Sequence, residues 1–243
     1  IEVVETPAQL KAFQHVPQYV YWHDPYYVTP LQSVERRFLD PTKNPFFKHG
    51  EARLFIARHG RQKVVGRISA AIDRDLDARW GKKFGFFGFF EFLGDARLPE
   101  ALLAGAVEWL RWKGAEEIVG PCNFTPNHPN CGLLIDGFDD DPTIETSYNP
   151  TNYTGFLARL PLEKWRDLHG YEIDAGPIPE RLAKFAKIAR ERHGVTVRPL
   201  DMSRFDEDLE TVRRIYNEAW AKNAGASEMR EDEMRFLSEG LRS

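Results

Sequence analysis

The pattern of hydrophobic and polar residues predicts an alternation of strands and helices. Apolar positions that recur at every second residue, or that run continuously, predict strands, and those that recur every three or four residues predict helices. Strands are expected at 1–5, 52–58, 63–72, 84–93, 117–122, 164–173 and 195–200. Helices are expected at 7–17, 31–39, 100–113, 150–160, 179–193, 205–222 and 230–241. This order of elements is typical of an α/β domain.

The segment 84–93 is the most informative of these strands. Its sequence, FGFFGFFEFL, holds six phenylalanines in ten residues, so the strand is expected to be buried. Gly85 and Gly88 interrupt it, and glycine inside a strand often marks a bulge or the close approach of another backbone. With the helix 100–113 and the strand 117–122 it makes a strand–helix–strand unit, which predicts a right-handed crossover between parallel strands.

Composition and charge exclude several classes of protein. Of the 243 residues, 42% are hydrophobic and 29% are charged, which is enough for a packed core. The net charge is −4 with basic and acidic residues mixed, so neither a nucleic-acid surface nor a polybasic membrane signal is expected. No apolar run approaches the ~20 residues that span a bilayer, and no signal peptide is visible, so a cytoplasmic location is expected.

The cysteines and the nearby histidine do not indicate a metal centre. Free thiols in a reducing compartment are favoured over a disulfide for Cys122 and Cys131. His128 is the one other soft ligand close to them, and the spacing fits no zinc pattern. His128 is expected to be exposed in a polar loop rather than catalytic. The sequence also contains no Ser-His-Asp arrangement, P-loop or dinucleotide glycine fingerprint, which argues against hydrolases and nucleotide-binding proteins.

The two ends of the chain repeat one order of elements. Residues 1–39 are predicted as strand, helix, aromatic link and second helix, and residues 195–241 are predicted in the same order. This echo favours a tandem architecture in which 195–243 begins a second, incomplete repeat. The alternative is a C-terminal helical extension that packs on the first domain.

The element order and several segments together resemble the GNAT superfamily of acyltransferases, in particular a bacterial branch that resembles a tandem of two such domains. The segments are NPFF, VVGRISAAID, GFFGFFEF, ALLAGAVEWLRWKGAEEIVGPCNF, GLLIDGF and YNPTNY. The similarity covers about residues 10–225 and is most specific from Gly88 to Phe138. It implies an α/β, GNAT-like fold with a mixed central sheet flanked by helices, in which residues 1–194 are the first domain.

The resemblance also implies a binding site for acetyl-CoA or another acyl-CoA between the fourth and fifth strands, here 84–93 and 117–122. The pyrophosphate would lie on backbone amides at the start of the intervening helix, because a helix N-terminus presents unpaired donors. The implied cofactor-binding residues are Phe92, Leu93, Arg97, Leu98 and Asn123.

The loop that should hold the phosphates departs from the family. The family pattern is Arg/Gln-x-x-Gly-x-Gly/Ala, whereas residues 94–99 read GDARLP and keep one early glycine. Asp95 would repel phosphate, and Pro99 lacks an amide donor. Arg97 offsets part of this loss through a charge-assisted contact.

Acyl transfer to an amine needs a neutral nucleophile, a polarised thioester carbonyl and a proton for the leaving thiolate. Glu91 is the only acid in the strand 84–93 and is the candidate base; the alternatives are that it points outward or pairs with a neighbour such as Arg67. The resemblance implies a tyrosine as the acid, here Tyr153 with Tyr148 as a second candidate, and the alternative is a packed tyrosine with a bonded hydroxyl.

Asn127, Tyr26 and Tyr27 are the candidate substrate-binding residues, with turn capping and an irregular packed loop as the alternatives. The predicted function is an N-acyltransferase that uses acyl-CoA to modify a small amine. The alternatives are a degenerate GNAT domain that serves as a scaffold or as the substrate-side half of a tandem, and a Fem-like aminoacyltransferase.

Overall fold

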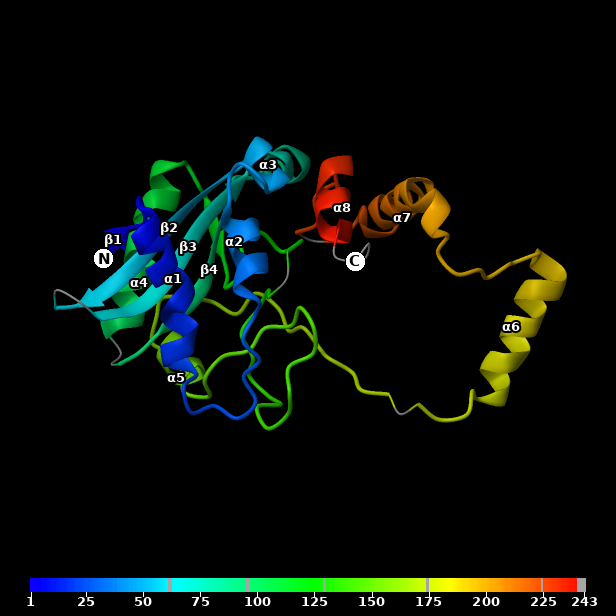
Figure 1. Ribbon diagram of the computed structural model, residues 1–243, viewed down its shortest axis with the longest axis horizontal. Helices are drawn as coiled ribbons and strands as arrows, with labels where there is room; N and C mark the ends of the chain where they lie inside the picture. Colours follow the sequence, from blue (N-terminus) through cyan, green and yellow to red (C-terminus); the bar gives the residue numbers. More distant parts are fainter. Residues whose placement is uncertain (61–62, 95–96, 129, 174, 224, 240–243) are drawn as a thin grey trace.

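The computed structural model describes the chain except for residues 61–62, 95–96, 129, 174, 224 and 240–243. Two predictions therefore fall partly outside the described residues: the turn expected at 59–62 between the strands 52–58 and 63–72, and the repulsive Asp95 of the phosphate loop. Of the described residues, those before 161 form a body around one sheet, and those from 161 to 200 leave it as an exposed stretch (Figure 1).

Within the described residues, five strands form one sheet in sequential order. The strands are β1 (Glu2–Val3), β2 (Gly50–His59), β3 (Lys63–Asp73), β4 (Phe84–Phe92) and β5 (Glu117–Val119). The first four pair antiparallel, and β4 pairs parallel with β5. Because α4 (Arg97–Trp112) connects the two parallel strands, the predicted strand–helix–strand crossover is confirmed.

Helices cover both faces of the sheet (Figure 1). Besides α4, the described helices are α1 (Pro7–Val20), α2 (Gln32–Leu39), α3 (Arg74–Trp80), α5 (Tyr153–Leu157), α6 (Glu180–His193), α7 (Phe205–Trp220), α8 (Glu231–Ser238) and the short 3-10 turns η1 (Pro45–Lys48) and η2 (Met202–Arg204). Side chains of α1 and α2 build one hydrophobic core with the sheet, and those of α4 and α5 build another on the opposite face. The mixed sheet flanked by helices is the predicted α/β, GNAT-like architecture.

A bulge in β4 decides which side chains face which helices. Glu91 lies opposite Arg67, and Gly88 lies opposite Ser69, so two residues of β4 stand against one of β3. Phe89 lies in this bulge with a φ of 44°. The extra residue shifts the alternation of the strand, and Glu91 therefore projects to the face covered by α1 and α2 rather than into the apolar core beneath α4.

Gly88 also permits the close approach that its place in the strand predicted. A Cβ atom at this position would lie 2.0 Å from the carbonyl oxygen of Cys122, which no side chain tolerates. The segment that follows β5 therefore comes against the backbone of β4 beside the bulge.

Two predictions about element boundaries are wrong. Helix α1 does not stop at Pro17 but continues to Val20. Pro17 has no amide to offer the carbonyl of Phe13, which instead accepts from Arg67 Nη1 at 3.4 Å. No helix was expected between the strands 63–72 and 84–93, yet α3 lies there, and Asp73 caps it by accepting from the amides of Asp75 and Leu76.

The predicted strands 164–173 and 195–200 are absent from the described residues. An extended segment becomes a strand only when another strand takes up its backbone groups. Both segments run exposed, away from the sheet (Figure 1).

The last two helices return to the body. Trp80 Nε1 donates to the carbonyl of Ala226 at 3.1 Å, and His49 bonds Glu233 of α8 at 2.8 Å. By contrast, α6 has no buried residue. The helix–link–helix part of the predicted echo is present in α7 and α8, and its strand is not. The division into 1–194 and 195–243 stays a prediction.

None of the helices in the described ranges has both the length and the apolar character that crossing a membrane demands.

Candidate functional site

The candidate site lies where β4 and β5 separate. Their last paired residues are Phe86 and Val119. Beyond this pair, the Cys122 amide still donates to the carbonyl of Phe87 at 2.6 Å, and the Oδ1 atom of Asn123 accepts from the Phe89 amide at 2.8 Å. Asn123, a predicted cofactor-binding residue, thus links the segment that follows β5 to the bulge of β4.

Tyr153 fills the gap between the separated strands. Its hydroxyl accepts from the Phe92 amide at 2.5 Å and donates to the Phe92 carbonyl at 2.9 Å. The Tyr153 ring stacks on the Phe92 ring with the centroids 4.1 Å apart. Burial, reinforced by the charge of Glu91, raises the pKa of Tyr153 well above its ordinary value. Tyr153 therefore keeps its proton at neutral pH, while it occupies the open backbone edge of β4.

A buried ion cluster lies on the other face of the same strand. Arg67 is 3% exposed and binds both oxygens of Glu91, at 2.6 and 3.1 Å. Its Nη1 atom binds Glu35 of α2 at 2.9 Å. Burial raises the pKa of Glu35, and the charge of Arg67 opposes that rise. The alternative in which Glu91 pairs with Arg67 is therefore what the structure shows; its role as a base stays a prediction.

Aromatic residues of the α1–α2 link lie beside this cluster. The Tyr21 ring stacks on Tyr27 at 3.8 Å, and its hydroxyl donates to the Tyr148 carbonyl at 3.1 Å. Burial raises the pKa of Tyr21 far above the usual range, with Glu91 as the next cause. The same two causes raise the pKa of Tyr27.

Tyr148 is bonded away from the gap. Its hydroxyl donates to Asp24 at 2.8 Å, and the Asp24 carboxylate also accepts from the Tyr26 amide at 3.0 Å. Burial and then this hydrogen bond raise the pKa of Tyr148 to about 12. Of the two predicted acids, Tyr153 is therefore the one that bonds β4, while Tyr148 contacts the Tyr27 ring and shares Asp24 with the Tyr26 amide.

The other predicted cofactor residues have mixed surroundings. Arg97 is exposed at the start of α4, whereas Leu98 packs against the core beneath that helix. The Leu93 amide donates to the Val65 carbonyl at 2.7 Å, so it faces β3 rather than the gap.

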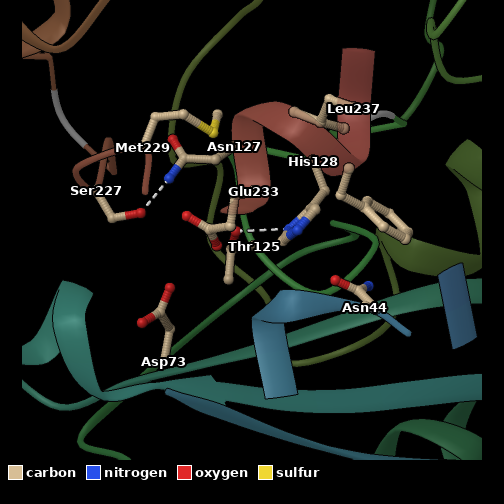
Figure 2. A pocket seen from close by; sticks show the side chains of 10 residues that line it. Asn44, Asp73, Thr125, Asn127, His128, Ser227, Met229, Glu233 and Leu237 are labelled. Carbon is tan, nitrogen blue, oxygen red and sulfur yellow. Dashed lines mark hydrogen bonds between the residues drawn. The ribbon is translucent and has the colours of Figure 1, made fainter. Parts of the chain in front are cut away.

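A cleft lined mainly by polar side chains lies between the body and the C-terminal helices (Figure 2). Asn127, a predicted substrate residue, donates here to the hydroxyl of Ser227. The expectation that His128 is exposed is wrong: it packs edge-on against Phe38 and Phe46, and Thr125 Oγ1 bonds its Nδ1 atom at 2.9 Å. Burial lowers the pKa of His128 to about 4.

His49 connects two carboxylates that line this cleft. Its Nδ1 atom lies 3.0 Å from Asp73, and its Nε2 atom lies 2.8 Å from Glu233. Burial alone would lower the pKa of His49, but hydrogen bonds to the two carboxylates raise it to about 9. The imidazole therefore carries a charge at neutral pH and donates through both nitrogens.

Glu35 and Tyr21 are the site residues that sequence reasoning missed. Glu35 lies in a short charged helix and Tyr21 in an aromatic-rich link, and neither pattern distinguishes a functional residue from a structural one. Among the described residues, no group of three His, Cys, Asp or Glu side chains is placed to hold a metal ion.

The topology and the separated strands define the class: this is a GNAT-like α/β fold. No family model matches the chain. It is 36% identical over 241 residues to the bacterial ceramide synthase of Caulobacter vibrioides, an alignment that covers 98% of this chain and 62% of that protein. It is 31% identical over 233 residues to Protein YghO of Escherichia coli K12, with coverages of 96% and 59%. The chain thus spans about three-fifths of the length of these relatives.

Two solved structures are similar to the chain at low identity. One chain, described as an acetyl transferase from Pyrococcus furiosus, has a TM-score of 0.43 and 17% identity and covers 71% of this chain and 99% of its own. The other is FeeM, an N-acyl amino acid synthase from uncultured soil microbes, with a TM-score of 0.35, 15% identity and coverages of 49% and 74%.

Proposed function

We propose that this chain is part of a cytoplasmic N-acyltransferase that transfers an acyl group from an acyl-CoA to an amine. The observation that carries the proposal is the hydroxyl of Tyr153, held at the open edge of β4 where the two central strands separate. The relative from Caulobacter is named a ceramide synthase, and a ceramide is the amide of a long-chain amino alcohol. We therefore place a long-chain amino alcohol beside small amines as the acceptor.

The residues at the gap fit an acyl-CoA at two points. Arg97 lies exposed at the N-terminal end of α4, where phosphates are favoured. The Phe92 amide and carbonyl point into the gap and match the polar arm of a pantetheine, because Tyr153 already bonds them from that side. The bound thioester supplies the activated acyl carbonyl. Binding of acyl-CoA along β4 requires that the Tyr153 hydroxyl break its hydrogen bonds to the Phe92 backbone.

Tyr153 is placed to act as the acid. Its hydroxyl carries a proton at neutral pH, and release from Phe92 leaves that proton free for a departing thiolate. Glu91 is suited to orient the acceptor side, because Arg67 fixes both of its oxygens. Proton removal from the amine by Glu91 proceeds through water in this proposal.

The test is an assay of the chain with a long-chain acyl-CoA and either a small amine or a long-chain amino alcohol. Amide product is measured by mass spectrometry. Tyr153→Phe is expected to lower the rate about 10²-fold or more, as loss of a general acid does. Glu91→Gln is expected to lower it less. Tyr171→Phe, in the exposed stretch, is the matched control and should leave the rate unchanged.

A second candidate function follows from the closed gap. Tyr153 and Asn123 already satisfy backbone groups of β4, which suits a domain that supports a second catalytic half rather than binding acyl-CoA itself. Calorimetric titration with acyl-CoA distinguishes the two. The enzyme is supported if titration with acyl-CoA releases heat with this chain but not with its Arg97→Ala variant. The enzyme is excluded if neither this chain nor the longer protein releases heat.

A further inference from the structure

Cys122 and Cys131 face each other beside the separated strands. Their Sγ atoms lie 2.7 Å apart, and the two residues form an isolated antiparallel bridge. The Gly132 amide donates to the Pro121 carbonyl at 2.7 Å. The two cysteines are therefore a non-hydrogen-bonded pair of an antiparallel bridge. Such pairs have Cα atoms about 4.5 Å apart, and disulfides need roughly 4.4–6.8 Å. The backbone therefore already has the geometry of a cross-strand disulfide.

The two thiols differ in access and acidity. Cys122 is buried, and Cys131 is partly exposed. The hydrogen bond from Cys122 lowers the pKa of Cys131, and the charge of Arg166 adds to that effect. The pair therefore has one accessible, more acidic thiol and one sheltered partner, which is the arrangement of an attacking and a resolving cysteine.

We propose that Cys122 and Cys131 are a site of reversible disulfide formation by small-molecule disulfides such as glutathione disulfide. The Cys131 thiolate attacks one sulfur of the oxidant, forms a mixed disulfide and releases one thiolate. Cys122 gives its proton to water, attacks the sulfur of Cys131 and releases the second thiolate. The protein loses two protons and two electrons, and the oxidant is reduced to two thiols.

The bond would hold the segment that follows β5 next to the bulge of β4. Cys122 bonds the Phe87 carbonyl through its amide, and its own carbonyl lies against Gly88. Asn123, the next residue, bonds the Phe89 amide. The disulfide would thus fix the backbone on one side of the gap in which Tyr153 lies.

The experiment compares folded and unfolded chain, because any two nearby cysteines can oxidise in a denatured protein. The chain is equilibrated with one fixed ratio of glutathione disulfide to glutathione, in buffer and in concentrated urea, quenched by alkylation and weighed by mass spectrometry. We expect the ratio of closed disulfide to dithiol to be about tenfold higher in the folded chain, because a disulfide that suits the fold is itself favoured by folding. An equal or lower ratio in the folded chain would overturn the proposal.

Variants test the order of the steps. Cys122→Ser should stop at a mixed disulfide on Cys131, whereas Cys131→Ser should react more slowly, because its remaining thiol is buried. Circular dichroism checks that each variant is folded. If Cys122→Ser does not fold, the comparison of folded and unfolded wild-type chain still tests the proposal. A glutathione adduct on Cys131 that persists in the folded wild type, or a disulfide between two chains, would also contradict the proposal.

Discussion

Helices α4 and α6 have similar sequence patterns and opposite surroundings. Each carries an apolar stripe at helical spacing. In α4 the stripe is covered, with Leu102 and Leu110 both fully buried. In α6 the stripe is open, with Leu182 at 57% and Phe185 at 54% exposure. An amphipathic pattern thus predicts that a helix has an apolar face, but it does not predict what covers that face.

The ionic groups of the body and those of the exposed stretch also differ in burial. Arg67 in the sheet is buried between two carboxylates, whereas Lys187 and Glu191 of α6 form a loose pair at 3.8 Å in solvent. Matched substitutions in the two regions can measure how much stability each contributes.

The largest effect is expected at Arg67. Arg67→Ala leaves Glu35 and Glu91 without their common partner, which should lower the free energy of unfolding by about 3–5 kcal/mol. Lys187→Ala should change it by less than about 0.5 kcal/mol, because exposed pairs contribute little. Urea denaturation measures both. A loss below about 1 kcal/mol for Arg67→Ala would show that the cluster is not stabilising the body.

The next effect tests the two helices directly. Leu102→Ala removes a fully buried side chain of α4 and should cost about 2–5 kcal/mol. Phe185→Ala in α6 should cost less than about 0.5 kcal/mol. If thermal unfolding shows equal losses, then α6 has a covered face in solution and the contrast between the helices fails.

A smaller effect is expected from the hydroxyl at the gap. Tyr153→Phe keeps the stacked ring but leaves the Phe92 amide and carbonyl without their partner, which should cost about 1–3 kcal/mol. Tyr171 is 84% exposed in the stretch 161–200, so Tyr171→Phe should be neutral. Amide hydrogen exchange at Phe92 provides a second measurement, and unchanged protection in Tyr153→Phe would rule out the hydrogen bond between the Phe92 amide and the Tyr153 hydroxyl.

The smallest effect is expected from pH. The pKa of His49 is raised to about 9, so its stabilising contribution is fully present below the unfolded value of about 6.5 and is lost as pH rises through about 9. The loss of stability cannot exceed the free energy needed to detach α8, because His49 bonds Glu233 of that helix. Asp75 pairs with Arg230 and Lys48 pairs with Asp232, and these two ion pairs hold the same segment independently of His49.

NMR titration of the His49 ring, together with urea denaturation at pH 7 and pH 9, checks this expectation. His49→Gln should flatten the dependence in that window, whereas His193→Gln, at the end of α6, should leave it unchanged. A ring of His49 that titrates near 6.5 would contradict the assigned charge.

The sequence by itself determined the order of elements and the buried central strand. The phenylalanines of 84–93, the stripe of α4 and the crossover between them are local or periodic signals, and these survive in the structure. The role of Gly88 was predictable for the same reason, because a glycine inside a buried strand usually marks a bulge or a close backbone approach. Glu91, Tyr153 and Asn123 were identified as residues of interest. Arg67 was named as one alternative partner of Glu91, whereas the partners of Tyr153 and Asn123 were not predicted.

Only the tertiary structure decided those partners. The bulge turned Glu91 toward Arg67, and the register of β4 with β3 sets that bulge. Pro17 freed the Phe13 carbonyl for the same arginine, a pairing of residues 54 positions apart. The predicted strands 164–173 and 195–200 did not form, because a strand needs a neighbour to bond, and periodicity carries no information about where that neighbour is.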